Sequence, residues 1–197
     1  MAGSSTASEG TPAFFFDLGS PEAYLAAERA LQVLPGVEWI PVLAAELPGH
    51  ESWEAFRCCD ERDIAVARVE RTAVQRGLQP LRWPDPFPFD ATLAMHVATY
   101  AKQIGRTVPF AQAAFRQAFA GGRALDRPDN VVIAAAACEM HPAAVLKGAE
   151  LRTVRDGLRQ ATADAVARGV RDVPAVVTAD GRVFHGDTEL ERAAAAA

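Results

Sequence analysis

The 197-residue sequence has little cysteine. It holds only Cys58, Cys59 and Cys138, and no pair of them has the C-x-x-C spacing. The missing pair argues against dithiol redox chemistry, and no histidine accompanies the cysteines at the spacing of a zinc site, so we expect no metal. Because cysteine is often buried, we expect three buried free thiols on helices.

Long apolar runs and blocks of like charge are also missing. No stretch of about 18 apolar residues occurs, so we expect no membrane span. The formal net charge is -5, and without a basic block nothing indicates nucleic acid as a partner. Residues 1–12 lack the basic and apolar regions of a secretory signal. We interpret them as a flexible tail and expect a cytoplasmic protein.

What is present is an ordinary globular composition, with 50% hydrophobic and 23% charged residues. Two apolar runs, "AFFFDL" from Ala13 and "VEWIPVLAAEL" from Val37, are typical of buried strands, although Pro41 weakens the second. Between them, Ser20 and Pro21 are favoured residues at a helix start, and the following Pro-Gly pair ends that helix. The short connections predict a right-handed parallel strand–helix–strand unit.

The middle of the chain is rich in Ala, Arg, Glu and Leu, which favours helices. We expect helices near residues 51–57, 60–77, 90–105, 108–121, 128–138 and 150–168, with Gly169 ending the last one. Further on, two β-rich runs flank Asp180-Gly181, a strong signal for a β-hairpin, and an alanine-rich helix follows. The expected order is therefore β, α, β, a helical block, a long helix, a hairpin and a helix.

A strand that leads to a serine at the mouth of a helix suggests anion chemistry. Unpaired N–H groups and the helix dipole stabilise an anion at a helix N-terminus. Ser20 cannot shuttle disulfides, but its hydroxyl could donate a hydrogen bond to the thiolate of a bound cofactor. The alternative is that Ser20 is an N-cap without chemistry.

The element order and three motifs resemble the DsbA-like branch of the thioredoxin superfamily, and within it the 2-hydroxychromene-2-carboxylate isomerase and kappa-class glutathione transferase group. The motifs lie at the first helix, in the central region and around the hairpin. The matching residues are Phe16, Asp17, Ser20, Pro21, Tyr24, Leu25, Arg71, Ala73, Gly77, Pro84, Phe87, Pro88, Ala165, Gly169, Val170, Val173, Pro174, Gly186 and Asp187.

The resemblance implies a thioredoxin-like α/β fold with a large all-helical insertion. The thioredoxin-like domain would comprise residues 13–46 and 150–197, and residues 47–149 would form the insertion. The family further implies that Ser20 contacts the thiol of the cofactor, that Pro174 is a cis-proline, and that the Val173 backbone pairs with the cysteinyl part of a glutathione-like ligand. Asp187 would bind a charged end of that ligand.

Three positions depart from the family pattern. Thr188 follows Asp187 where glutathione-using relatives have arginine, Glu22 replaces an aromatic residue, and Thr162 replaces asparagine. A carboxylate at residue 22 suits the helix dipole but would repel a nearby thiolate. The cofactor is therefore expected to be glutathione or another low-molecular-weight thiol.

A substrate pocket is expected near Ser20. Its candidate residues, each with a purely structural alternative, are Asp17, Pro21, Tyr24, Trp83, Phe87 and His185. Asp17 could be a turn acceptor, the "RWPDPFPFD" loop could simply pack aromatic rings, and His185 could be an exposed hairpin residue. An aromatic loop over a cleft suits a hydrophobic substrate.

Two functions follow from this sequence. The first is a thiol-dependent isomerase or transferase that acts on a small hydrophobic or aromatic molecule. By analogy with the family, such a protein could form a homodimer. The second is a DsbA-like oxidoreductase homologue that has lost redox activity and binds a peptide or protein partner through the Pro174 edge. No G-x-S-x-G elbow is present, which argues against a serine hydrolase.

Overall fold

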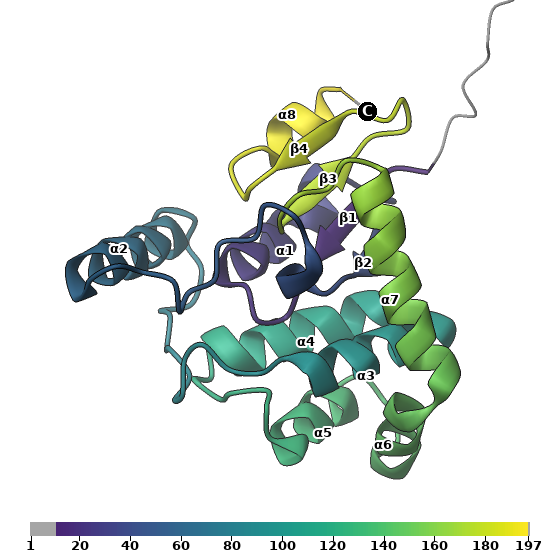
Figure 1. The fold of residues 1–197 in the computed structure, drawn as a ribbon. Coiled ribbons are helices and arrows are strands. Elements are labelled where there is room, and N and C mark those ends of the chain that lie inside the picture. Colours follow the sequence, from purple (N-terminus) through teal and green to yellow (C-terminus); the bar gives the residue numbers. More distant parts are fainter. Residues whose placement is uncertain (1–10, 197) are drawn as a thin grey trace, which may run out of the picture.

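Four short strands form one mixed sheet in the computed structural model, which describes residues 11–196 (Figure 1). The strands are β1 (Ala13–Phe16), β2 (Glu38–Pro41), β3 (Ala175–Val177) and β4 (Val183–His185), in the order β2-β1-β3-β4. β1 and β2 are parallel, whereas β3 runs antiparallel to both β1 and β4. The inner strand β1 thus joins the first part of the chain to the last, and the expected parallel unit and hairpin are confirmed.

The helices fall close to most of the expected ranges. They are α1 (Pro21–Val33), α2 (Cys59–Gln75), α3 (Thr92–Gln103), α4 (Thr107–Phe119), α5 (Pro128–Ala136), α6 (Pro142–Glu150), α7 (Arg152–Ala167) and α8 (Leu190–Ala194), and a 3-10 turn η1 (Ala44–Glu46) follows β2. Gly169 directly follows the C-cap of α7 at a φ of 88°, and Gly36 lies in the turn after α1 at a φ of 82°, where glycine carries no steric penalty. None of these helices is long and apolar enough to cross a bilayer.

Successive residues of β1 serve two separate cores, because side chains alternate across a strand. Phe14 and Phe16 join the larger core, which contains residues of α1, α3, α4 and α8. Phe15 joins a smaller core with residues around the end of α7, and the Arg168 guanidinium lies 5.3 Å from its ring centre. All four residues of β1 are buried, which explains why its sequence is continuously apolar.

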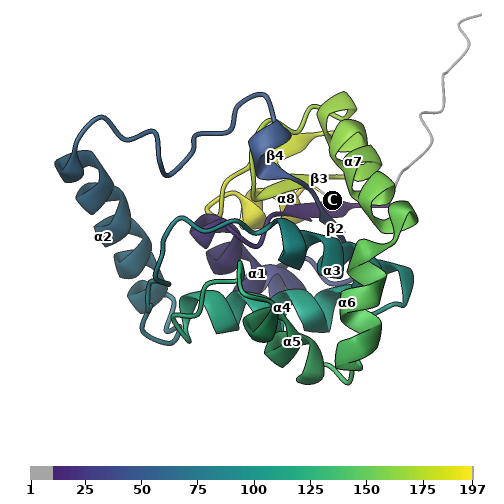
Figure 2. The same ribbon diagram turned by 60° about the horizontal axis from the view of Figure 1, so that its bottom comes forward.

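The segment between η1 and α7 is helical wherever it is regular. α3 to α6 pack as a group beside the sheet, and both ribbon views show α2 projecting away from the rest of the molecule (Figures 1 and 2). This arrangement agrees with an α/β fold that carries a helical insertion. The division of the chain into domains at residues 47 and 149 stays a prediction, and residues 1–10 of the expected tail lie outside the described range.

Two expectations from the sequence are wrong. Residues 51–57 form turns rather than a helix, because Ser52 makes local hydrogen bonds with the backbone of Glu54 and Ala55 while Trp53 packs on other aromatic rings. Cys58 and Cys59 are exposed at the start of the projecting α2, and only Cys138 is buried.

α6 was not expected, although Pro142 at its first position is a helix-start signal. Gly148, a poor helix former, obscures the pattern. Glycine is required at residue 148 for steric reasons, because a Cβ atom there would lie 2.6 Å from Cδ2 of Tyr100 on α3.

We expect Gly148→Ala to destabilise the protein by about 1–3 kcal/mol, since the methyl group overpacks the α3–α6 contact. Gly157→Ala on α7 is the matched control, because its Cβ would be no closer than 3.7 Å to Thr99. That substitution should stabilise by about 0.5–1 kcal/mol. Denaturant unfolding of both variants checks the pair, and equal effects of the two substitutions would contradict the packing argument.

Candidate functional site

Ser20 caps the N-terminus of α1. Its backbone is extended, its Oγ accepts a hydrogen bond from the backbone N–H of Ala23 at 3.1 Å, and Pro21 fills the first helical position. As an acceptor in this bond, the hydroxyl keeps its proton to donate to a ligand. The structure therefore shows the capping role directly and leaves the expected thiol contact possible.

The strand register brings the Val173–Pro174 segment to the same end of β1. Phe15 pairs with Ala175 in the antiparallel β1–β3 ladder, so the residues just before β3 lie beside the residues just after β1. The Val173–Pro174 peptide bond is cis, as the resemblance implied. The capped N-terminus of α1 and the cis-proline segment thus both lie at the C-terminal end of β1, a region that we call the Ser20 edge.

Asp17 holds this edge together. Its Oδ1 accepts from the N–H of Gly19 at 2.8 Å and its Oδ2 from the N–H of Ala44 at 2.9 Å, so one carboxylate joins the β1–α1 turn to the segment after β2. Burial raises the pKa of Asp17, and these two bonds oppose that rise. The turn-acceptor alternative for Asp17 is what the geometry displays.

The residues before Pro174 are held from two sides. Oδ1 of Asp172 accepts from the Val173 N–H at 2.8 Å and lies 3.1 Å from Nδ1 of His50. The backbone N–H of Arg171 donates to Nε2 of His185 at 3.0 Å, which ties this loop to β4. The Val173 N–H already has a partner within the chain, and His185 is a loop-positioning residue rather than a free hairpin side chain.

Asp187, which follows β4, forms an ion pair with Arg76 at the end of α2. Arg76 NH2 lies 2.6 Å from Asp187 Oδ2, and both side chains are only about 15% exposed. Although the two groups form an ion pair, the buried Oδ2 accepts no hydrogen bond from the described residues. Arg76 thus places a guanidinium beside Asp187, whereas Thr188 stands where the resemblance implied an arginine.

Glu22 is also neutralised by α2. Its Oε1 accepts from Arg68 NH2 at 2.9 Å. Burial raises the pKa of Glu22, while the helix start and Arg68 oppose the rise. The charge that could repel a thiolate next to Ser20 is thus compensated.

An aromatic cluster lies between α2 and α4. Trp53, Trp83 and Phe87 pack mutually, with ring centres 4.8 to 5.4 Å apart, and Phe119 of α4 lies beneath them. Nε1 of Trp83 donates to Glu70 of α2 at 2.9 Å. Tyr24 instead lies in the core against Phe119, and burial raises its pKa to about 12.

Several residues at this edge were missed by sequence reasoning. Arg76, His50 and Asp172 reach it through contacts with residues far away in the sequence. The isolated charges gave no local signal of their partners. Among residues 11–196, no group of three or more His, Cys, Asp or Glu side chains could hold a metal ion.

The sheet, the capped helix and the cis-proline segment define a thioredoxin-like protein. A family model described as the DSBA-like thioredoxin domain matches residues 13–196, so the chain belongs to the DsbA-like thioredoxin family. None of the curated proteins compared with it gives a significant match.

Two solved structures illustrate the fold. A 2-hydroxychromene-2-carboxylate isomerase superposes with a TM-score of 0.83 and 18% identity, over 95% of this chain and 94% of the other. A probable DsbA oxidoreductase from Streptomyces coelicolor gives 0.74 and 18%, over 94% and 87% of the two chains. At these identities the likeness shows the fold.

We expect acid to weaken the contact between Arg171 and His185. Burial lowers the pKa of His185 from 6.5, and its Nε2 can accept the hydrogen bond only when the ring is neutral. A histidine whose pKa is lower in the folded protein than in the unfolded chain stabilises the fold at neutral pH. That stabilisation is lost as the pH falls below the pKa of the unfolded chain.

His185→Gln offers a side-chain oxygen as acceptor and does not titrate. Between about pH 7.5 and pH 5, the free energy of unfolding of the parent should fall further than that of this variant. Parallel pH profiles in denaturant unfolding would contradict the assignment.

Proposed function

We propose that this protein is a thiol-dependent isomerase or transferase that acts on a small hydrophobic or aromatic substrate, with glutathione or another low-molecular-weight thiol as cofactor. One observation carries the proposal. Ser20 caps α1 beside the cis-proline segment, at the position where redox members of the superfamily keep their attacking cysteine. The similar isomerase structure supports the choice of reaction.

The chain's own groups suit a thiolate at this edge. The N-terminus of the 13-residue α1 favours a negative charge, and the Ser20 hydroxyl can donate to it. The pairing of Glu22 with Arg68 offsets part of the repulsion that the Glu22 carboxylate would exert on a thiolate. When bound, the thiol would supply the nucleophile for an electrophilic carbon.

The opposite end of the cofactor would meet the Asp187–Arg76 pair. The buried Oδ2 of Asp187 can accept from an ammonium group, and the Arg76 guanidinium can pair with a carboxylate. Glutathione carries both groups at its γ-glutamyl end. We therefore infer that Arg76 takes over the task of the arginine that Thr188 replaces.

The cofactor contact of Ser20 can be separated from its capping role. Ser20→Ala removes both the cap and the hydroxyl and should cost about 1 kcal/mol of stability. Ser20→Gly also removes the hydroxyl, but glycine is tolerated as an N-cap, so it should cost only about 0.3 kcal/mol. Both variants should lose binding of reduced glutathione.

The measurement is thermal stability of the parent and both variants with reduced glutathione, cysteine and S-methylglutathione. A ligand at about 100 times its Kd stabilises the native state by roughly 2.7 kcal/mol. S-methylglutathione, which has no thiol, should stabilise less than glutathione. A parent protein that responds to none of these ligands would overturn the proposal and favour the partner-binding module.

Arg76→Ala should weaken glutathione binding by about tenfold or more, because a charge-assisted contact in a half-buried site is lost. Arg76→Lys keeps the charge but not the planar fork and should show an intermediate loss. Arg68→Ala is the comparison variant, since it removes the ion pair between α2 and Glu22 of α1 and leaves the Asp187 contact in place. Calorimetric titration gives the Kd values, and equal losses for the Arg68 and Arg76 variants would count against a direct contact.

A further inference from the structure

His50 differs from the other histidines in its bonding. Its Nδ1 lies 3.1 Å from Oδ1 of Asp172, and its Nε2 makes no hydrogen bond with any residue in the range 11–196. By contrast, Nε2 of His185 already accepts from the N–H of Arg171. An ionised carboxylate can only accept a hydrogen bond, so Nδ1 of His50 carries the proton and Nε2 of the neutral ring can accept another.

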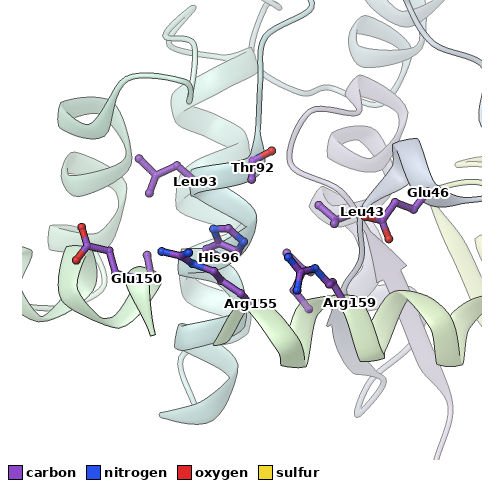
Figure 3. A pocket seen from close by; sticks show the side chains of 10 residues that line it. Leu43, Glu46, Thr92, Leu93, His96, Glu150, Arg155 and Arg159 are labelled. Atoms are coloured by element: carbon purple, nitrogen blue, oxygen red, sulfur yellow. The ribbon is translucent and has the colours of Figure 1, made fainter. Parts of the chain in front are cut away.

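His96 shows how a half-buried histidine behaves without a carboxylate partner. It lines a cavity of about 450 Å³ beside Arg155 of α7, and Arg159 lies one turn further along that helix (Figure 3). Burial lowers the pKa of His96 first, and the two arginines lower it further, against an opposing effect of Asp90. These surroundings disfavour a protonated ring, whereas the Asp172 carboxylate stabilises one at His50.

The segment that carries His50 is docked on the loop before the cis-proline. The N–H of Gly49 donates to the carbonyl oxygen of Arg171 at 2.8 Å, and the N–H of His50 donates to the carbonyl oxygen of Leu47 at 3.2 Å. A Cβ atom at residue 49 would lie 3.0 Å from the same oxygen of Arg171, so glycine permits this close approach. The His50 ring is therefore held by its backbone as well as by Asp172.

This histidine and its carboxylate partner lie at the Ser20 edge. Oδ1 of Asp172 also accepts from the N–H of Val173, so a single oxygen atom joins the His50 ring to the residue before the cis-proline. Burial raises the pKa of Asp17, and the positive charge of His50 is among the effects that oppose this rise. His50 is thus close enough to the turn that leads to Ser20 to act on it electrostatically.

The charged groups around His50 favour an imidazolium. Asp172 is in contact with the ring, Asp17 lies across the Ser20 edge, and Glu51 is the next residue in the chain. Arg171, on the loop that faces His50, is exposed to solvent. The His50 side chain is 25% exposed, so a ligand can reach it while much of the bulk solvent is excluded.

We propose that His50 is the base that takes the proton from the cofactor thiol. The S–H bond breaks, its electron pair stays on the sulfur, and the proton bonds to Nε2, which leaves a thiolate beside an imidazolium that Asp172 stabilises. When the thiol departs at the end of an isomerisation, His50 returns the same proton to the sulfur. This inference rests on the proposed function, because it assumes a thiol cofactor at the Ser20 edge.

The test measures thiolate formation in bound reduced glutathione by ultraviolet absorbance as the pH is raised, with the S-methylglutathione complex as the blank. In the parent, the midpoint should lie at least about one pH unit lower than in His50→Asn, because an imidazolium within about 4–6 Å favours the charged sulfur. Above about pH 9 the two curves should converge, since a thiol with a pKa of about 8.5 ionises there without help.

The variants separate proton transfer from loop positioning. Asparagine at residue 50 keeps an N–H that can donate to Asp172 but has no titratable base. Asp172→Asn still offers an oxygen to the N–H of Val173, and it should move the midpoint upward by a smaller amount, because the imidazolium loses its partner. His96→Asn is the matched control, because His96 has no contact with Asp172 and should give the curve of the parent.

Imidazole proton NMR gives a second readout. His50 should stay protonated to higher pH in the glutathione complex than in the free protein, since the thiolate stabilises the imidazolium. S-methylglutathione has no thiol proton to give and should change this titration little. The spectrum of His50→Asn assigns the signal, and thermal unfolding confirms that the variants are folded.

The outcome distinguishes this proposal from the proposed function. If glutathione binds to both the parent and His50→Asn and their thiolate curves coincide, His50 is not the base and the thiol-dependent function stands. Equal shifts in His50→Asn and His96→Asn would also refute the role of His50, because they would show a general effect of charge. A parent protein that binds no thiol would overturn both proposals.

Discussion

The buried carboxylate of Asp17 is the constraint on which the functional edge depends. It accepts one backbone hydrogen bond from the turn that leads into α1 and another from the segment that follows β2. A buried carboxylate is costly unless its oxygens are satisfied, so this pairing fixes both segments relative to β1. The turn that leads to Ser20 and the segment that follows β2 are therefore both positioned by this one side chain.

Charge compensation organises the other side of the site. The insertion contributes two arginines from one helix, Arg68 and Arg76, and each meets an acidic residue of the thioredoxin-like part. Glu22, which in isolation argues against a nearby thiolate, is thereby offset. Asp187, which lacks the arginine that the resemblance implied at the next position, pairs instead with Arg76, more than one hundred positions earlier in the chain. Departures from a local motif can thus be restored by tertiary contacts.

Much of the fold could be predicted because its signals are local. The apolar run of β1, the Ser-Pro start of α1 and the Asp-Gly turn each reflect the conformational preferences of a few adjacent residues, and the cis bond at Pro174 followed from the family resemblance. The predicted helix at residues 51–57 is absent, because the local hydrogen bonds of Ser52 and the aromatic packing of Trp53 override a composition that favours a helix. The partners of Asp187 and Asp172 could not be foreseen, since Arg76 and His50 approach them only after the chain has folded.

The projection of α2 has a consequence for its dynamics. Only Val69 and Ala73 of its 17 residues are buried, while Ile64 and Val74 are about 70% exposed. A solitary helix of about 15 residues is marginal in water, so α2 depends on its few contacts with the rest of the chain. It is the segment whose local opening should cost the least free energy, and its amide hydrogens should exchange with solvent well before those of β1 or α4. Because Arg76 caps the C-terminal end of α2, its ion pair with Asp187 would break in each such opening, so that at any moment the pair exists in only a fraction of the molecules.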